Sequence, residues 1–309
     1  MVPIDQVHLS FNPQTLTVLN AVLGLVMFGV ALELRIEDFK IALRTPKALA
    51  LGLVGHHILF PAMTYVLITI LQPVPSIALG MLLVSACPAG HVSNFLVNYS
   101  KGNTALSVSV SALSTVLALF MTPLNFAFWG NLHPITAGLM KEVAMSPWAM
   151  LEVIVMLLGV PLVLGMTVAK RFPAFSHKIQ KPMKIFSFLV LMGFILGALA
   201  ANFQHFLNYI GLVLLVVFVH NLMALSTGYG LSALIGLKEV DRRAITFEMG
   251  IQNSGLGLIL IFNFFDGLGG MALVTAWWGI WHIVAGTTLA TYWKNHPPID
   301  PAQRVGATA

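Results

Sequence analysis

Long apolar segments, separated by short polar connections, run through almost the whole chain. A helix needs about 20 mainly apolar residues to cross the hydrocarbon layer of a bilayer. Only 9% of the 309 residues are charged, whereas typical soluble domains contain about 25%. So few charges cannot cover a water-exposed surface. Because Cys87 is the single cysteine, a fold held together by disulfide bonds within the chain is also excluded. The sequence therefore predicts an all-α integral membrane protein, with membrane lipid as its surroundings.

By this length criterion the sequence predicts nine transmembrane helices in one unit over residues 1–309. Their expected bounds are 14–34, 47–71, 75–99, 103–128, 147–169, 184–203, 207–236, 244–265 and 270–293. Of the 16 Lys and Arg residues, only Lys141 lies away from the tail and the connections after odd-numbered spans. Because basic loops face the cytoplasm, we expect an outside N-terminus, a cytoplasmic tail at 294–309 and insertion in the plasma (inner) membrane. Charges spread in this way indicate topology, and no nucleic-acid partner is expected.

Two of the nine spans are interrupted. Residues 87–94 in the third span and 248–255 in the eighth combine Gly or Pro with polar side chains. Unpaired backbone groups at this depth cost several kcal/mol each, so such breaks occur where they are buried in protein or line a wet cavity. Close packing of small residues is the alternative, but it explains glycine and not Glu, Gln, Asn and Ser together. Paired interruptions in two halves of a chain are typical of a transporter binding site.

The two interruptions are separated by five spans, so the helices that contain them cross the membrane in opposite directions. Aligning spans one to four with spans six to nine pairs them and leaves the fifth unmatched. This pattern predicts a five-plus-five inverted repeat that lacks its first helix. The second half-helices begin after Gly90 and Gly250, where free N–H groups attract anions, while the carbonyls that end the first halves attract cations. The sequence thus favours an anion carried with a cation.

Several short motifs lie in and around the interruptions. They are Met27-Phe28-Gly29 with Asp38-Phe39, Cys87-Pro88-Ala89-Gly90 with Ser93-Asn94, Lys101-Gly102-Asn103 with Leu106-Ser107, residues 248–255, and Trp281-His282 with Leu289-Ala290-Thr291-Tyr292-Trp293. At these residues the chain resembles the bile acid:sodium symporter family. The resemblance implies a secondary transporter, not an enzyme, in which a core domain with two crossed broken helices moves against a panel domain by alternating access. The core would comprise residues 47–128 and 207–293, and the panel residues 14–34 and 147–203.

The resemblance also implies binding of one or two sodium ions. The first site would consist of Ser93, Asn94, Ser107, Ser111 and Glu248, and the second of Glu248, Gln252, the backbone carbonyls of Met249 and Ile251, and His56. Independently of the resemblance, Ser107 and Ser111 share one helix face, and a carboxylate in a membrane helix usually marks an ion or proton pathway. An alternative for the serine hydroxyls is donation to carbonyls one turn back.

The expected solute is an organic anion that binds where the second half-helices begin. The residues for this role are His91, Val92, Asn253, Ser254 and His282. The resemblance allows a bile acid or a small carboxylate such as pantoate or a 2-oxo acid. His91 would add positive charge when protonated, which favours a solute smaller or more acidic than a bile salt. The oligomeric state is not predicted.

His56 departs from the family pattern, in which glutamine is usual at this position. An imidazole nitrogen is a poor ligand for a hard alkali cation, so the second sodium site has three alternatives. His56 orients a water molecule, couples transport to protons together with Glu248, or simply packs beside His57. Alternatives from other classes are a metal transporter using His56, His57 and His91, a passive channel, and an intramembrane hydrolase using Ser254. Transport is favoured because Ser254 lacks the preceding glycine of such hydrolases and because opposed broken helices suit an occluded site.

Overall fold

The computed structural model describes residues 4–8, 13–33, 45–143, 146–201 and 203–298. Every regular element within these residues is a helix, and they contain no strand, which confirms the predicted all-α class. The Asp38-Phe39 motif, Arg35, Lys40 and Arg44, and the tail beyond residue 298 lie outside the described residues.

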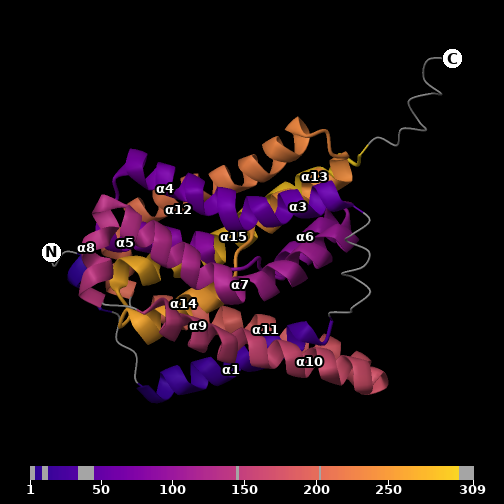
Figure 1. Cartoon of the computed structure of the whole chain (residues 1–309), viewed down its shortest axis with the longest axis horizontal. Helices are drawn as coiled ribbons and strands as arrows, with labels where there is room; N and C mark the ends of the chain where they lie inside the picture. Colours follow the sequence, from indigo (N-terminus) through magenta and orange to yellow (C-terminus); the bar gives the residue numbers. More distant parts are fainter. Residues whose placement is uncertain (1–3, 9–12, 34–44, 144–145, 202, 299–309) are drawn as a thin grey trace.

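The helices follow one another with short connections (Figure 1). The first half of the chain contains η1 (Ile4–Gln6), α1 (Pro13–Ala31), α3 (Pro46–Val54), the π-helix η2 (Gly55–Leu59), α4 (Phe60–Leu71), α5 (Pro75–Ala86), α6 (Val92–Tyr99), α7 (Thr104–Leu132) and α8 (Pro134–Val143). The second half contains α9 (Pro147–Ile154), the π-helix η3 (Val155–Gly159), α10 (Val160–Arg171), α11 (Pro173–Ala201), α12 (Phe203–Leu234), α13 (Glu239–Gly250), α14 (Ser254–Phe264) and α15 (Gly269–Asn295).

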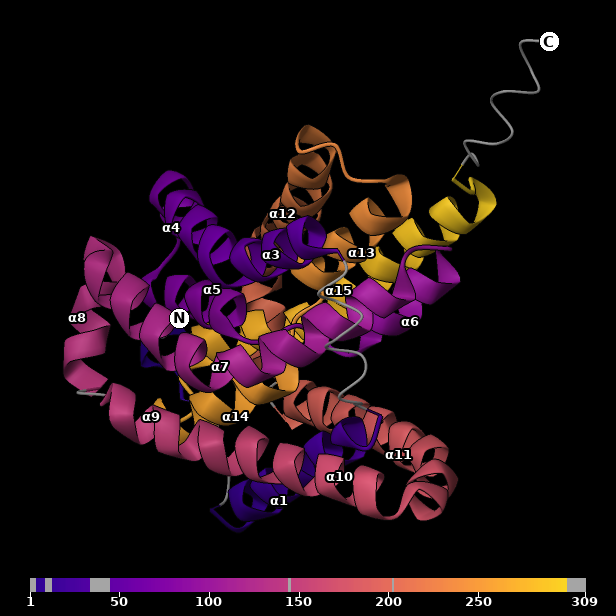
Figure 2. The same ribbon diagram turned by 45° about the vertical axis from the view of Figure 1, so that its right-hand side comes forward.

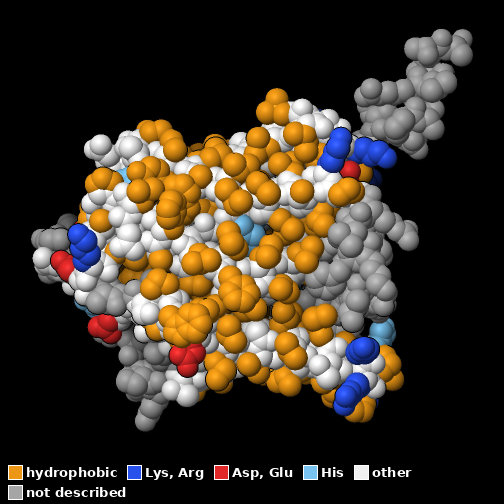
Figure 3. All heavy atoms as spheres, in the orientation of Figure 1, with side chains coloured by type: hydrophobic (Ala, Val, Ile, Leu, Met, Phe, Trp, Pro, Cys, Tyr) orange, Lys and Arg blue, Asp and Glu red, His pale blue; other side chains and the backbone are white. Residues whose placement is uncertain are grey.

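Five helical stretches of the described chain are long and apolar enough to cross a bilayer. They are Pro46–Leu71, Thr104–Leu132, Pro147–Arg171, Leu207–Leu234 and Gly269–Asn295, and three shorter apolar helices accompany them, Asn20–Ala31, Pro75–Ala86 and Ser254–Phe264. Figure 3 shows hydrophobic side chains across the middle of one face, with Lys and Arg side chains toward its left and right ends. An apolar belt between charged ends is the surface that a lipid bilayer requires.

One expected helix start was wrong, and one helix was not expected. The sequence predicts a connection before residue 184, whereas α11 already begins at Pro173, and the short helix α8 was not predicted. Hydropathy locates the part of a helix that is apolar enough for lipid. It does not report how far the helix continues into polar sequence, because polar residues also form helices.

One group of helices lies below the rest of the molecule in both Figure 1 and Figure 2. It contains α1, α10 and α11. Helices α1 and α10 pack closely because Gly165 has no side chain: a Cβ there would lie 2.5 Å from Ala31 Cβ and 2.7 Å from the Phe28 carbonyl oxygen. The group contains most of the predicted panel, although residues 147–159 of that panel form α9 and η3, and the division into two moving domains stays a prediction.

The two interruptions lie where the sequence predicts them and contact each other. The first separates α5 from α6 at residues 87–91, and the second separates α13 from α14 at residues 251–253. Gly90 N–H donates to the Ile251 carbonyl at 2.8 Å, and Asn253 N–H donates to the Pro88 carbonyl at 2.9 Å. A Cβ on Gly90 would lie 2.8 Å from the Gln252 carbonyl oxygen, so the two backbones approach this closely because residue 90 is glycine.

A π-turn, η2, interrupts the second predicted span and carries His56 and His57. Pro61 follows it, and proline has no N–H for the carbonyl four residues earlier, that of His57. Asn125 of α7 supplies the missing donor, because its Nδ2 lies 2.7 Å from the His57 carbonyl oxygen. The wider turn buries both imidazoles, with His56 0% and His57 3% exposed. A π-turn of this kind often marks a functional position.

Candidate ion and solute site

The carboxylate of Glu248 lies at the centre of a cluster of oxygen atoms. Glu248 is fully buried near the end of α13. Ser93 Oγ of α6 donates to its Oε1 at 2.6 Å. From α7, Ser107 Oγ donates to Oε1 at 2.5 Å and Ser111 Oγ to Oε2 at 2.7 Å. One carboxylate thus joins both broken helices to α7.

Asn94 completes what we call the oxygen cluster, which consists of Ser93, Asn94, Ser107, Ser111 and Glu248. Asn94 Oδ1 lies 2.8 Å from Ser107 Oγ and 3.3 Å from Ser111 Oγ. Each hydroxyl has one hydrogen, yet each of these two faces both a carboxylate oxygen and the amide oxygen. The oxygen lone pairs of these side chains therefore outnumber the hydroxyl hydrogens that could bond to them. A buried, oxygen-rich group of this kind is an environment that a hard cation stabilises.

Helix α7 shows both roles expected for its serines. Ser109 Oγ donates to the Ala105 carbonyl one turn back at 2.8 Å. Ser107 and Ser111 lie on another face of the helix, and their hydroxyls point to Glu248. The structure thus brings together the five residues of the predicted first sodium site, while their role as ion ligands stays a prediction.

The residues of the predicted second sodium site are also neighbours, but most of their polar groups already have hydrogen-bond partners in the protein. Gln252 Nε2 donates to the Met249 carbonyl at 2.8 Å, and the Ile251 carbonyl accepts from Gly90 N–H. His56 places Nδ1 3.1 Å from the backbone carbonyl oxygen of Glu248 and Nε2 2.9 Å from that of Cys87. The ring therefore faces the backbone of Glu248 and not its carboxylate.

A cavity of about 370 Å³ lies beside the two breaks. It is lined by all five predicted solute residues, His91, Val92, Asn253, Ser254 and His282. Apolar side chains form most of the remaining wall, among them Leu23, Val26 and Met27 of α1 and Ile185 and Leu189 of α11. The cavity thus lies between the breaks, α1, α11 and α15.

Three polar atoms in the cavity lining have no hydrogen-bond partner within the described chain. They are Gln252 Oε1, Ser254 Oγ and His282 Nδ1, and their residues are 1%, 3% and 5% exposed. Asn253 differs, because its Oδ1 accepts from Leu256 N–H and caps α14. A buried polar atom without a partner costs about 1–3 kcal/mol. This end of the cavity is therefore suited to a ligand with polar atoms of its own.

The sequence did not predict the side chains that bind the carbonyls at the broken ends. Thr122 Oγ1 donates to the Ala86 carbonyl at 2.7 Å, and Asn221 Nδ2 donates to the Gly250 carbonyl at 2.7 Å. Both residues are buried polar groups within membrane spans. Polarity at that depth is the signal that could have identified them. Among the described residues no group of three His, Cys, Asp or Glu side chains could hold a metal ion, so His56, His57 and His91 do not form the metal site considered above.

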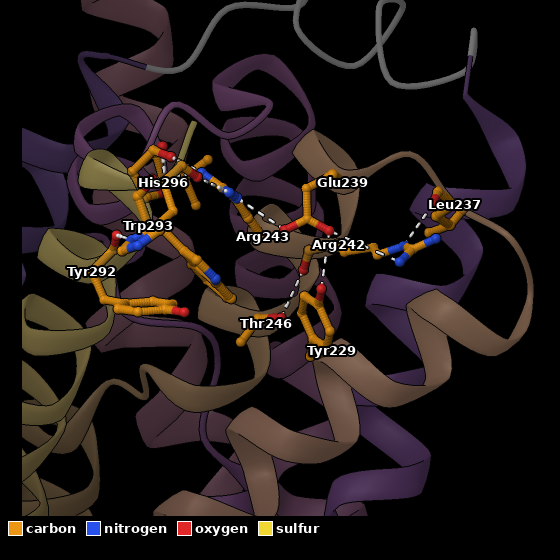
Figure 4. Close-up of polar contacts among 11 residues, drawn as sticks. Tyr229, Leu237, Glu239, Arg242, Arg243, Thr246, Tyr292, Trp293 and His296 are labelled. Carbon is orange, nitrogen blue, oxygen red and sulfur yellow. Dashed lines mark hydrogen bonds and ion pairs between the residues drawn. The ribbon is translucent and has the colours of Figure 1, made fainter. Parts of the chain in front are cut away.

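At the charged end of α13, Arg243 fixes the helix that carries Glu248. Its guanidinium donates to the carbonyls of Ser100, Trp293 and His296 at 2.7, 3.0 and 2.7 Å and pairs with Glu239 at 3.1 Å (Figure 4). These carbonyls lie at the ends of α6 and α15. Arg243 therefore ties one half of each broken helix to α15.

Comparison with known proteins shows to which family the chain is similar. The family model described as "Sodium Bile acid symporter family" matches residues 20–225. The chain is 31% identical to an uncharacterized sodium-dependent transporter of Bacillus subtilis, YocS, over 88% of this chain and 82% of that protein. It is 30% identical to the probable chloroplastic sodium/metabolite cotransporter BASS2 of Oryza sativa subsp. japonica, over 88% of this chain and 63% of that protein. It is 28% identical to the human P3 protein, over 83% of this chain and 53% of that protein. The chain therefore belongs to the sodium bile acid symporter family, whose members are membrane transporters and not enzymes.

Proposed function

We propose that the protein is a secondary transporter that carries Na⁺ and a small organic anion together by alternating access. The observation that carries this proposal is the oxygen cluster, in which three serine hydroxyls lie 2.5–2.7 Å from the buried Glu248 carboxylate. A buried carboxylate is costly unless it is paired. Its neighbours are oxygen atoms, the ligands that hard cations prefer.

The cavity favours a small solute with one negative charge. Its volume of about 370 Å³ is near the lower end of the roughly 300–1,000 Å³ of typical ligand pockets. None of the described residues in its lining is Lys or Arg, so the starts of α6 and α14 and a few polar atoms are what receive the anion. A monocarboxylate with an apolar body suits this lining better than a bile acid or a dicarboxylate. Ser254 Oγ and His282 Nδ1 would bind its polar end.

Ion and solute would be coupled through the breaks that they share. Ser93 and Asn94 of the oxygen cluster directly follow His91 and Val92, which line the cavity. Na⁺ bound at Glu248 would hold α6 in place and so fix the backbone that the anion contacts. By linkage, the anion would then raise the affinity for Na⁺ by the same factor.

The proposed topology is the nine-span inverted repeat, with the N-terminus outside, the tail in the cytoplasm and insertion in the plasma membrane. The antiparallel bridge between Ala89 and Gln252 supports the opposite directions of the two broken helices. The position of the cavity between the breaks on one side and α1 and α11 on the other supports a core that moves against a panel. Such a movement would open the cavity to one side of the membrane at a time.

Sodium is the better-supported driving ion. Proton coupling through His56 and Glu248 acting as a pair would be favoured by a direct contact between their side chains. His56 contacts the backbone carbonyl of Glu248, whereas the carboxylate contacts the three serines. The carboxylate is thus arranged for a cation held by oxygen ligands.

The test compares Na⁺ with K⁺ in two measurements, the stabilisation of the protein by a solute and the uptake of that solute. Purified protein is screened by thermal shift with small monocarboxylates and matched dicarboxylates, and uptake of the best ligand is measured in proteoliposomes at fixed pH. We expect Na⁺-dependent binding of a monocarboxylate that is lost in Glu248→Gln. Equal uptake in K⁺, or uptake driven by a pH gradient without Na⁺, would overturn the proposal.

A further inference from the structure

The carbonyl oxygens of residues 86–88 and 248–251, which end the first half-helices and begin the breaks, all accept hydrogen bonds from the protein. In the first break the Ala86, Cys87 and Pro88 carbonyls accept from Thr122, His56 and Asn253. In the second, the carbonyls of residues 248–251 accept from His56, Gln252, Asn221 and Gly90. Carbonyls that end a broken half-helix are the groups that bind coupling cations in many transporters. Here side chains and backbone of the same chain take that position.

His56 is distinctive because it serves both breaks at once. Its ring lies 2.9 Å from the Cys87 carbonyl oxygen, which follows α5, and 3.1 Å from the Glu248 carbonyl oxygen near the end of α13. A neutral imidazole donates to one of these oxygens and an imidazolium to both. In each case the ring fills the space from which a cation would reach either oxygen. An ion at this position would have to displace the buried ring.

Backbone geometry holds the ring there. His56 belongs to the π-turn that precedes Pro61, and its neighbour His57 turns away to Ser114, where Nε2 lies 3.1 Å from Oγ. Asn125 fixes the same turn through the His57 carbonyl. The ring is fully buried. It thus links the two broken helices from within the protein.

We propose that the His56 imidazole takes the place of a second coupling cation, so that this transporter binds one Na⁺ per protein, in the oxygen cluster. The inference rests on the proposed function and adds the number of ions and the residue that sets it. The oxygen cluster keeps more lone pairs than hydrogens, so it retains a place for an ion, whereas the carbonyl ends are bridged by the ring. His56 acts as a positioning residue that holds the breaks together without a second ion.

Counting bound Na⁺ tests this proposal directly, with Na⁺ itself as the probe. Equilibrium binding of radioactive Na⁺ to the purified full chain gives the number of ions per protein. We expect one in the wild type and two in His56→Gln, because the glutamine amide offers an oxygen ligand where the ring offered N–H groups. The control is His57→Gln on the same turn, whose ring contacts Ser114; it should still bind one. A structural defect alone would lower the count and would not raise it.

Two results would overturn the proposal. Binding of two Na⁺ by the wild-type protein shows that the ring does not replace an ion, and this measurement needs no variant to fold. A folded His56→Gln protein that still binds one Na⁺ shows that the ring is not what fills the second position. Failure of the proposed function looks different, because the wild-type protein would then bind no Na⁺ above the level in Glu248→Gln.

Discussion

Replacing Ser111 by alanine tests the oxygen cluster with a minimal change. Ser111 is 1% exposed, and its hydroxyl lies 2.7 Å from Glu248 Oε2 and 3.3 Å from Asn94 Oδ1. Alanine keeps the helix and removes one oxygen. The matched control is Ser109→Ala on the same helix, because Ser109 is also buried but donates to the Ala105 carbonyl of its own turn.

The size of the effect follows from the contact that is lost. A hydrogen bond or ligand contact to a charged group is worth about 1.5–3 kcal/mol, which corresponds to an affinity loss of about 10- to 140-fold. At a Na⁺ concentration of about 100 times the wild-type Kd, Na⁺ adds about 2.7 kcal/mol to stability. A loss of about 30-fold in Ser111→Ala would reduce that gain to about 0.9 kcal/mol.

The assay is a Na⁺ titration of thermal unfolding at constant ionic strength, with choline replacing Na⁺. Each variant is compared with its own stability in choline, so a general loss of stability cancels. The midpoint of the Na⁺ response should move to higher concentration in Ser111→Ala and stay in place in Ser109→Ala. If both variants respond like the wild type, Ser111 is not an ion ligand, and the lone-pair surplus inferred for the cluster is wrong.

Three further variants test the parts that support the site. In Gly90→Ala, the new Cβ would lie 2.8 Å from the Gln252 carbonyl oxygen, so we expect the Na⁺-dependent gain in stability to disappear while the helical circular dichroism persists; an unchanged gain would mean that the breaks need not touch. Asn125→Leu leaves the His57 carbonyl without its 2.7 Å donor and should cost about 1–3 kcal/mol, measured as a lower unfolding midpoint in choline, whereas an unchanged midpoint would refute this role. Arg243→Lys cannot bridge three carbonyls as the guanidinium fork does, so solute uptake should fall; retention of full uptake would show that this tie is dispensable.

The sequence predicted the breaks well because a break in a membrane helix needs residues that are rare at that depth. Pro88 and Gly90 interrupt one span and Gly250 the other, and the polar residues beside them have few explanations in lipid other than a buried site. Position along the chain also predicted that the breaks would meet, since paired interruptions in opposed spans share a midplane. These inferences needed residue types and spacing but no contact between side chains.

The supporting contacts could not be predicted in the same way. Thr122 and Asn125 lie in α7 and Asn221 lies in α12, and a polar residue within a membrane span has several explanations, including helix association. The partner of each is a backbone carbonyl, and every residue type has one, so the sequence contains no complementary signal. Their roles became visible only when the fold showed which carbonyls the breaks and Pro61 leave without a donor.

His56 shows where sequence reasoning reaches its limit at this site. A histidine at this position of the second span left four possibilities open: a poor ligand of a second sodium ion, a partner for a water molecule, a proton pair with Glu248, or a ring packed beside His57. These possibilities differ in the groups that the two ring nitrogens of His56 face. The orientation of the ring depends on the π-turn η2, because the extra residue in such a turn changes the direction of the side chains around it. The ring lies against the Cys87 and Glu248 carbonyls and not against the Glu248 carboxylate. Under the proposal made above, the ring takes the place of a cation there, so the number of bound Na⁺ ions depends on one side chain, and His56→Gln should raise that number from one to two.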